Sequence, residues 1–210
     1  MPTRVSDSTL EQFREAAASQ QPTPAGVAVA AVSAGFALGL LAKVLTVTGR
    51  RKALSEDTPR LEALIAAAQA ASQRMLRLAD DDIAAFEAYL AAKRRPRSTE
   101  SERQARQQDI NSSVERAIEL PLAAAHEAAA GLQLCSEASA VSTPPALVAD
   151  LGVVASLLAS ALRGFLLCAE SNVRQLAPDA ASHRERLATE TKQHDQTLRR
   201  TEALLESIKP

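Results

Sequence analysis

The sequence predicts an all-α protein, a multihelical antiparallel up-and-down bundle, and two observations support this. Hydrophobic residues make up 46% of the 210 residues, yet aromatic residues are only 2% and Trp is absent. This bias toward alanine and leucine favours helices over sheets, which draw on β-branched and aromatic residues. Apolar residues also recur every three or four positions between prolines and capping residues. We expect a single domain over residues 1–210, because that length suits one sizeable core.

The first two helices are separated by a proline-rich stretch. Ser8 and Glu11 fit a capping box, in which a hydroxyl and a carboxylate three residues later satisfy free backbone N–H groups. A short helix therefore begins there. The segment QQPTP ends it, because prolines cannot continue a helix. Pro24 is well placed to open a second helix of about residues 24–46.

Two long helices are predicted next. Thr58, followed by proline, suits the start of a third helix whose apolar stripe lasts about eight turns. The segment KRRPRST ends this helix at Pro96, and Thr99 with Glu102 forms a second capping box. The fourth helix keeps its apolar pattern beyond Pro121, so we expect that proline to kink it rather than end it.

Two further helices complete the bundle. Residues 146–176 are strongly apolar, and a last helix is expected over about residues 180–208. The last helix carries a seam at spacings of seven, four and three, as in coiled coils. The seam residues are Leu187, His194, Leu198, Thr201, Leu205 and Ile208.

The composition also limits the kinds of binding partner and the cellular compartment that we expect. With 24 Lys and Arg against 25 Asp and Glu, the net charge of −1 gives no overall attraction to nucleic acid or to anionic membranes. Cys135 and Cys168 lack the spacing of a disulfide or zinc motif, and the three histidines are scattered. No secretory signal pattern is recognisable near the N-terminus. We therefore expect a cytoplasmic protein with reduced thiols, no metal and no nucleic-acid partner.

The run from Ala16 to Ala42 carries no charge and is long enough to cross a membrane. Alanine and glycine give it little transfer free energy per residue, and no aromatic belt flanks it. Small residues at Ala31, Gly35 and Gly39 favour close approach of a neighbouring helix instead. We expect a helix at the centre of the bundle and no membrane partner.

Two groups of carboxylates stand out as candidate acids or bases. Asp80, Asp81 and Asp82 lie within the third helix, at least one of them near its apolar face. Asp150 is the only charge between positions 137 and 163. A buried carboxylate has a raised pKa unless it is paired, which suits proton transfer. A solvated acidic patch and a helix-capping aspartate are the structural alternatives.

Several segments occur in an order that resembles one family over about residues 8–200. They are PTPAGVAVAAVSAG, GRRK, LADDDIAAF, the Leu120-Pro121 pair and VADLGVVASLLASALRG. This chain resembles the formiminotetrahydrofolate cyclodeaminase and methenyltetrahydrofolate cyclohydrolase family. The resemblance implies a homodimeric helical bundle that binds a folate and acts at its N5–N10 one-carbon bridge. It also implies that no cofactor is needed beyond the tetrahydrofolate substrate.

The resemblance assigns site residues. It implies acid/base or charge-stabilising roles for Asp82, Asp150 and, less directly, Asp80. Substrate binding is implied for the loop residues Pro24, Ala25, Gly26 and Val27, the basic turn Arg50, Arg51 and Lys52, and Asn172. The basic turn would hold the glutamate tail of the folate through charge-assisted hydrogen bonds. A solvated basic turn at a helix C-terminus is the alternative.

The chain also departs from the family pattern. Of three loop glycines in the family, only Gly26 remains, and Val27 restricts both backbone freedom and close ligand approach. Two family asparagines fall on Leu45 and Cys168, and a family serine falls on Ala149. Two functions therefore stay open. One is a cyclohydrolase or cyclodeaminase; the other is a non-catalytic relative that keeps the dimeric bundle, with or without folate binding.

Overall fold

The computed structural model describes residues 4–51, 58–141, 144–174 and 181–207, with Arg51 as backbone alone. Within these residues there is no strand, which confirms the predicted all-α class. A 3-10 turn, η1 (Val5–Asp7), precedes the α-helices. The helices are α1 (Leu10–Ala17), α2 (Gly26–Arg51), α3 (Thr58–Arg94), α4 (Glu100–Ser139), α5 (Pro145–Arg174) and α6 (Ala181–Ser207).

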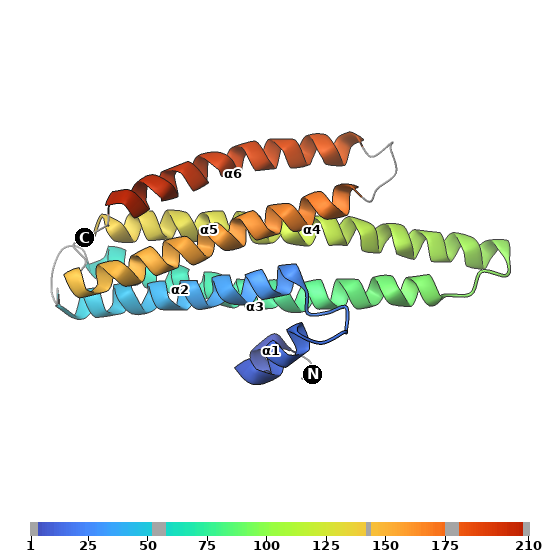
Figure 1. The fold of residues 1–210 in the computed structure, drawn as a ribbon, viewed down its shortest axis with the longest axis horizontal. Coiled ribbons are helices and arrows are strands. Elements are labelled where there is room, and N and C mark those ends of the chain that lie inside the picture. The colour runs from blue at the N-terminus through green and yellow to red at the C-terminus, as the bar shows by residue number, and fades with distance from the viewer. Residues whose placement is uncertain (1–3, 52–57, 142–143, 175–180, 208–210) are drawn as a thin grey trace.

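The long helices form an elongated bundle in which successive helices run in opposite directions (Figure 1). Helix α2 packs against α3 and α5, and α4 packs against the same two helices. Helix α6 lies outside this four-helix core, along α4 and α5. The short helix α1 lies at the lower edge of the bundle (Figure 1), and its Phe13 packs against the core. The predicted antiparallel bundle is therefore confirmed.

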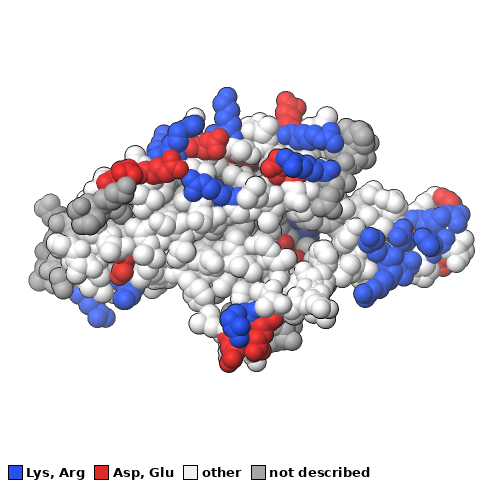
Figure 2. Space-filling model, viewed as in Figure 1, with Lys and Arg blue, Asp and Glu red and all other residues white. Residues whose placement is uncertain are grey.

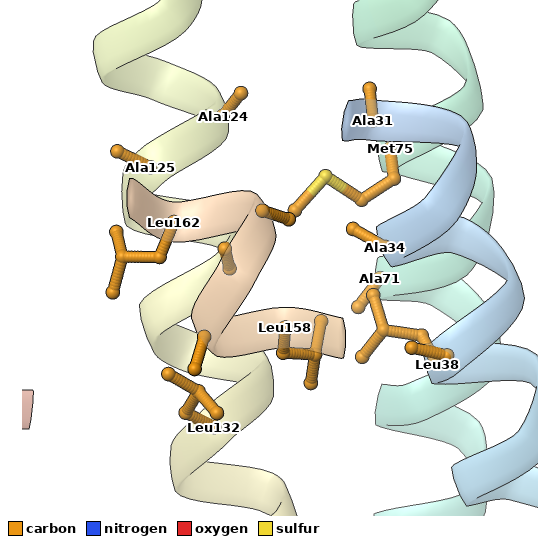
Figure 3. Close-up of a cluster of buried hydrophobic side chains, with 14 of the residues drawn as sticks. Ala31, Ala34, Leu38, Ala71, Met75, Ala124, Ala125, Leu132, Leu158 and Leu162 are labelled. Carbon is orange, nitrogen blue, oxygen red and sulfur yellow. The ribbon is translucent and has the colours of Figure 1, made fainter. Parts of the chain in front are cut away.

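Small side chains allow the four core helices to approach one another closely. Alanines of α2, α3 and α4 meet larger residues of α3 and α5 in a shared interior (Figure 3). At Gly35 an added Cβ would lie 3.3 Å from Leu76, and the Ser72 hydroxyl donates a hydrogen bond of 2.8 Å to the Gly35 carbonyl. The prediction of close approach is therefore confirmed at Gly35. Gly39 is exposed and has nothing within 4 Å of an added Cβ, so no helix of the same chain approaches it, and close approach there stays a prediction for a second chain.

Helices α2 and α5 are long and apolar enough, by length and composition, to cross a membrane. In the bundle, 61% of the most apolar window of α2 and 50% of that of α5 are buried. Core helices of soluble bundles have this composition because they are surrounded by other helices. The uncharged run of the sequence thus belongs mainly to a core helix.

Several helix ends differ from the sequence prediction. The first capping box is formed by Thr9 and Gln12, one residue later than predicted, and α1 begins at Leu10. Helix α2 begins at Gly26 rather than Pro24. It continues through Gly49 to Arg51, so the turn predicted at Gly49 is wrong and these residues are helical.

Other local predictions are confirmed. Thr99 and Glu102 form the predicted capping box at the start of α4. Helix α4 runs through Pro121 without ending. Four of the predicted seam residues of α6 are buried, namely Leu187, His194, Leu198 and Thr201, whereas Ile208 lies outside the described residues.

The α3–α4 hairpin extends beyond the other helices, and Lys and Arg side chains gather at its free end (Figures 1 and 2). They belong to the end of α3, the connecting loop and the start of α4. These residues are Lys93, Arg94, Arg95, Arg97, Arg103 and Arg106. Several are already paired: Arg95 with Asp109, and Arg103 with Glu100.

Candidate functional site

A pocket of about 400 Å³ lies where four core helices meet near the N-terminus of α2. This volume falls within the range of small-molecule sites in proteins, about 300–1,000 Å³. The start of α2 and the middle of α3 and α4 form three walls, and the C-terminal part of α5 forms the fourth. The walls include Ala25, Gly26, Val27, Asp82, Phe86, Tyr89, Ser113, Ala117, Cys168, Ser171 and Asn172.

Asp82 connects the wall formed by α3 to the start of α2. The first N–H groups of a helix have no partner within the helix, so they need an acceptor from elsewhere. Asp82 accepts a hydrogen bond from the backbone N–H of Ala28, the third residue of α2. Asp82 thus acts as a capping group from a distant part of the sequence.

The Asp82 carboxyl has an unusual pKa. Burial raises it from 3.8 to about 6, and the hydrogen bond from Ala28, which lowers the pKa, offsets this only in part. A carboxyl with a pKa near 6 exchanges protons readily close to neutral pH, as a general acid or base must. The predicted raised pKa is therefore found at Asp82.

Cys168 lies beside Asp82 in the same pocket. An added Cβ on Gly26 would lie only 3.1 Å from the Cys168 Sγ, so the one retained loop glycine lets α2 approach α5 closely. Burial, and in second place the Asp82 charge, raises the pKa of the Cys168 thiol. This thiol stays protonated at neutral pH and is a poor nucleophile.

Asn172 and Pro121 are linked through one carbonyl group. Pro121 has no backbone N–H, so within α4 it cannot pair with the carbonyl of Ala117, four residues earlier. The side-chain amide of Asn172 donates a hydrogen bond of 2.6 Å to that carbonyl. The amide nitrogen is thus used for packing α5 against α4, which leaves the side-chain oxygen as the acceptor available to a ligand.

Two aromatic rings form one side of the pocket. Phe86 and Tyr89 have ring centroids 6.1 Å apart, and the Lys93 Nζ lies 5.2 Å from the centroid of the Tyr89 ring. Phe86 is 37% exposed and lines the pocket rather than the core. A flat ligand could stack on such rings.

The structure brings together only some of the residues predicted for the site. Asp82, Asn172 and three loop residues line the pocket, whereas Pro24 is buried beside it and borders a separate surface hollow near Val29. The Asp80 carboxylate accepts a hydrogen bond of 2.6 Å from the N–H of Val5. Asp80 therefore fixes η1 onto α3 rather than facing the pocket.

Asp150 and the basic turn lie at the opposite end of the bundle. From Ala28 to Arg50 the rise along α2 is about 33 Å, and from Asp150 to Cys168 along α5 it is about 27 Å. Because α2 and α5 are antiparallel, Arg50 and Asp150 are at the same end. The side chain of Arg51 and all of Lys52 lie outside the described residues.

Tyr89, Ser113 and Ser171 line the pocket but were not predicted as site residues. Tyr89 could have been found, because it follows Asp82 at seven positions and Phe86 at three, which places all three on one helix face. The two serines carry no comparable signal. They reach the pocket through the packing of α4 and α5.

We predict that Asn172→Ala lowers the free energy of unfolding by about 1–3 kcal/mol, because the Ala117 carbonyl loses its partner. In a Pro121→Ala background the same change should cost clearly less, since residue 121 then donates to that carbonyl. Urea unfolding of the wild type, both single variants and the double variant measures this coupling. Equal costs of Asn172→Ala in both backgrounds would contradict the link.

The raised pKa of Asp82 predicts a pH effect on stability. Between about pH 4 and 6 the folded protein holds a proton that the unfolded chain has released, so the Asp82 contribution to stability falls as the pH rises. Asp82→Asn removes this contribution. Urea unfolding at pH 4.5 and pH 7 should therefore show the variant gaining stability relative to wild type at the higher pH. An unchanged difference between the two proteins would refute the raised pKa.

The comparisons with known proteins agree on one family. A sequence model described as formiminotransferase-cyclodeaminase matches residues 9–193. A methenyltetrahydrofolate cyclohydrolase of Methylorubrum extorquens is 28% identical over 179 residues, which cover 85% of each chain. The formimidoyltransferase-cyclodeaminase of Sus scrofa is 29% identical over 182 residues. That match covers 86% of this chain but only 34% of the pig protein.

A solved structure shares the fold. The crystal structure of formiminotetrahydrofolate cyclodeaminase from Thermotoga maritima matches with a TM-score of 0.69 at 21% sequence identity. The match covers 97% of this chain and 96% of that one. Since the family model spans most of the sequence, the resemblance predicted from its motifs is confirmed. The chain belongs to the formiminotransferase-cyclodeaminase family.

Proposed function

We propose that this protein acts on one-carbon derivatives of tetrahydrofolate, as a methenyltetrahydrofolate cyclohydrolase or a formiminotetrahydrofolate cyclodeaminase. The observation that carries the proposal is Asp82, a carboxyl with a pKa near 6 that lines a ligand-sized pocket in a member of this family. Neither reaction changes the oxidation state of the transferred carbon. The proposal therefore needs no redox cofactor, and the folate enters as the substrate.

In the cyclohydrolase reaction, water adds to the cationic carbon that bridges N5 and N10. The attacking water loses one proton and gives a hydroxyl adduct. The hydroxyl then loses its proton as the bond from the carbon to N5 breaks; N5 takes up one of the two protons, the other is released, and 10-formyltetrahydrofolate forms. Ionised Asp82 serves as the base for the water. Its negative charge also stabilises the cationic substrate, since charges interact strongly in a pocket shielded from water.

In the cyclodeaminase reaction, N10 attacks the formimino carbon and ammonia leaves. The departing nitrogen must be protonated, so this reaction needs an acid. With a pKa near 6, about a tenth of Asp82 is protonated at pH 7. The same residue thus serves either reaction, and its pKa does not favour one over the other.

The pocket walls suit the flat pterin ring of a folate. Phe86 and Tyr89 offer ring faces for stacking, and the side-chain oxygen of Asn172 offers an acceptor. The N–H groups at the start of α2, beside Ala25 and Gly26, suit a carbonyl or anionic edge of the ligand.

Val27 favours a second candidate function. Its side chain is only 6% exposed and belongs to the core, yet it borders the pocket where the family pattern has glycine. A valine at this place in the pocket wall is consistent with a non-catalytic relative that binds a folate without turning it over. The first assay below separates the two functions.

A homodimer would unite the predicted residues that one chain keeps apart. Helices α2 and α5 expose apolar side chains on one face, namely Val29, Phe36, Val153 and Leu157. A Cβ added to Gly164 would lie 3.8 Å from the Ala30 Cβ, so these two positions face each other across α2 and α5. Because the helices are antiparallel, this register places Leu157 about level with Phe36. A two-fold axis near Phe36 would place the Asp150 end of one protomer over the pocket end of its partner.

The central test is turnover of methenyltetrahydrofolate, followed by loss of its near-ultraviolet absorbance above the buffer rate, with ammonia release from formiminotetrahydrofolate in parallel. We expect Asp82→Asn to lower kcat/KM about 10²–10⁴-fold, as loss of a general acid or base does. Asp81→Asn is the matched control, because Asp81 is a neighbour that faces Arg116 at 3.7 Å instead. Folate binding without turnover by wild type would favour the non-catalytic relative. Wild type that neither binds nor turns over folates would refute both functions.

The dimer predicts complementation. If Asp150 acts in the pocket of the partner, the Asp82→Asn and Asp150→Asn variants are each inactive alone. When the two variants are dissociated, mixed and allowed to re-associate, half of the dimers contain one chain of each variant. Each of these heterodimers has one intact site out of two, so the mixture should regain about a quarter of the wild-type sites. Light scattering should give twice the chain mass for wild type, and Phe36→Lys should halve it. No recovery on mixing, with dimers formed, would refute the shared site.

A further inference from the structure

Three side chains from two helices that are distant in the sequence meet on the outer side of the bundle, where α6 lies along α4 (Figure 1). His126 comes from α4, and Glu190 and His194 lie one turn apart on α6. The His126 Nε2 lies 2.6 Å from the Glu190 Oε2, and the His194 Nε2 lies 3.8 Å from the same oxygen. One ligand atom from each of the three lies within 4.8 Å of the other two.

His194 is the member that most needs a ligand. It is 2% exposed, and neither ring nitrogen has a hydrogen-bond partner among the described residues. A buried polar group without a partner costs free energy, so such groups are rare unless something binds them.

We propose that His126, Glu190 and His194 bind a zinc ion that joins α6 to α4. Two imidazoles and a carboxylate are ligands that zinc takes in proteins. With bonds of 2.0–2.2 Å in tetrahedral geometry, neighbouring ligand atoms lie about 3.3 Å apart. The two separations given above, 2.6 and 3.8 Å, lie on either side of that value. Small side-chain movements therefore suffice to form the site.

The surroundings leave room for a fourth ligand. His126 and His194 border a pocket of about 570 Å³ between α4 and α6, which can hold a water or a small anionic ligand on the metal. Arg186 is close enough to Glu190 for their charges to interact, but its guanidinium donates its hydrogen bonds to Glu119. Metal on the Nε2 of His194 would leave its Nδ1 protonated and in need of an acceptor, for which a water is the simplest choice.

In this proposal the metal has a structural role, which is to hold α6 against α4. This helix is polar, and its buried residues are Leu187, His194, Leu198 and Thr201, only two of them apolar. Among the described residues, further ion pairs between α6 and α4 are at least partly exposed, namely His183 with Glu115 and Arg186 with Glu119. Exposed pairs add little stability. The metal site and the folate pocket share no lining residue, so this proposal stands apart from the proposed function.

The test uses the full chain, stripped of metal with EDTA and dialysed. Zn²⁺ is titrated in competition with a chromophoric chelator, and Co²⁺ is added separately to record its visible spectrum. Wild type should bind one Zn²⁺ per chain and give the intense absorption of four-coordinate Co²⁺. His126→Ala should weaken Zn²⁺ binding at least about 10-fold, since a direct ligand is lost. His126 is half-exposed, so this variant should stay folded, which circular dichroism checks.

His183→Gln is the matched control, because His183 also joins α6 to a carboxylate of α4 but, among the described residues, belongs to no group of three side chains placed to hold a metal ion. Its Zn²⁺ affinity should equal that of wild type. Thermal unfolding should shift upward with Zn²⁺ in wild type and in His183→Gln, but not in His126→Ala. Absence of stoichiometric binding by wild type would overturn the proposal. Equal loss of affinity in His126→Ala and His183→Gln would overturn it as well.

Discussion

The hydrogen bond from the Ala28 N–H to the Asp82 carboxylate is the interaction on which the candidate site depends. It joins the start of the core helix α2 to the middle of α3, and so fixes the two walls between which the pocket opens. The carboxyl is also half-buried. Burial outweighs the hydrogen bond and leaves the pKa near 6, so one arrangement both positions the loop and prepares an acid or base.

The other walls follow from two departures from regular helix packing. Pro121 frees the Ala117 carbonyl, and Asn172 satisfies it, which fixes α5 against α4 beside the pocket. Gly26 lets α2 approach Cys168 closely. The site thus lies where free backbone groups of two helices, the Ala28 N–H of α2 and the Ala117 carbonyl of α4, are satisfied by neighbouring side chains. Pocket and core cannot be changed independently, as the burial of Val27 illustrates.

Much of the fold could be predicted from the sequence because helix signals are local. The Thr99 capping box, the passage of α4 through Pro121 and the buried seam of α6 depend on residues near each other in the chain. The raised pKa of Asp82 could be suspected, but its partner Ala28 could not, since 54 positions separate them. For the same reason Asp80 was grouped with Asp82, although it bonds Val5 instead. The cluster of His126, Glu190 and His194 likewise has no sequence spacing that reveals it.

The most direct measurement is the titration of the Asp82 side-chain carboxyl by carbon-13 NMR, with its signal assigned from the Asp82→Asn variant. The account predicts a midpoint near pH 6, and a shift of that midpoint when a stable cationic or neutral folate analogue binds the pocket. A midpoint close to the ordinary value of 3.8, unaffected by the analogue, would contradict it. Asp82 would then be a solvated carboxylate, and the pocket would lose its acid or base.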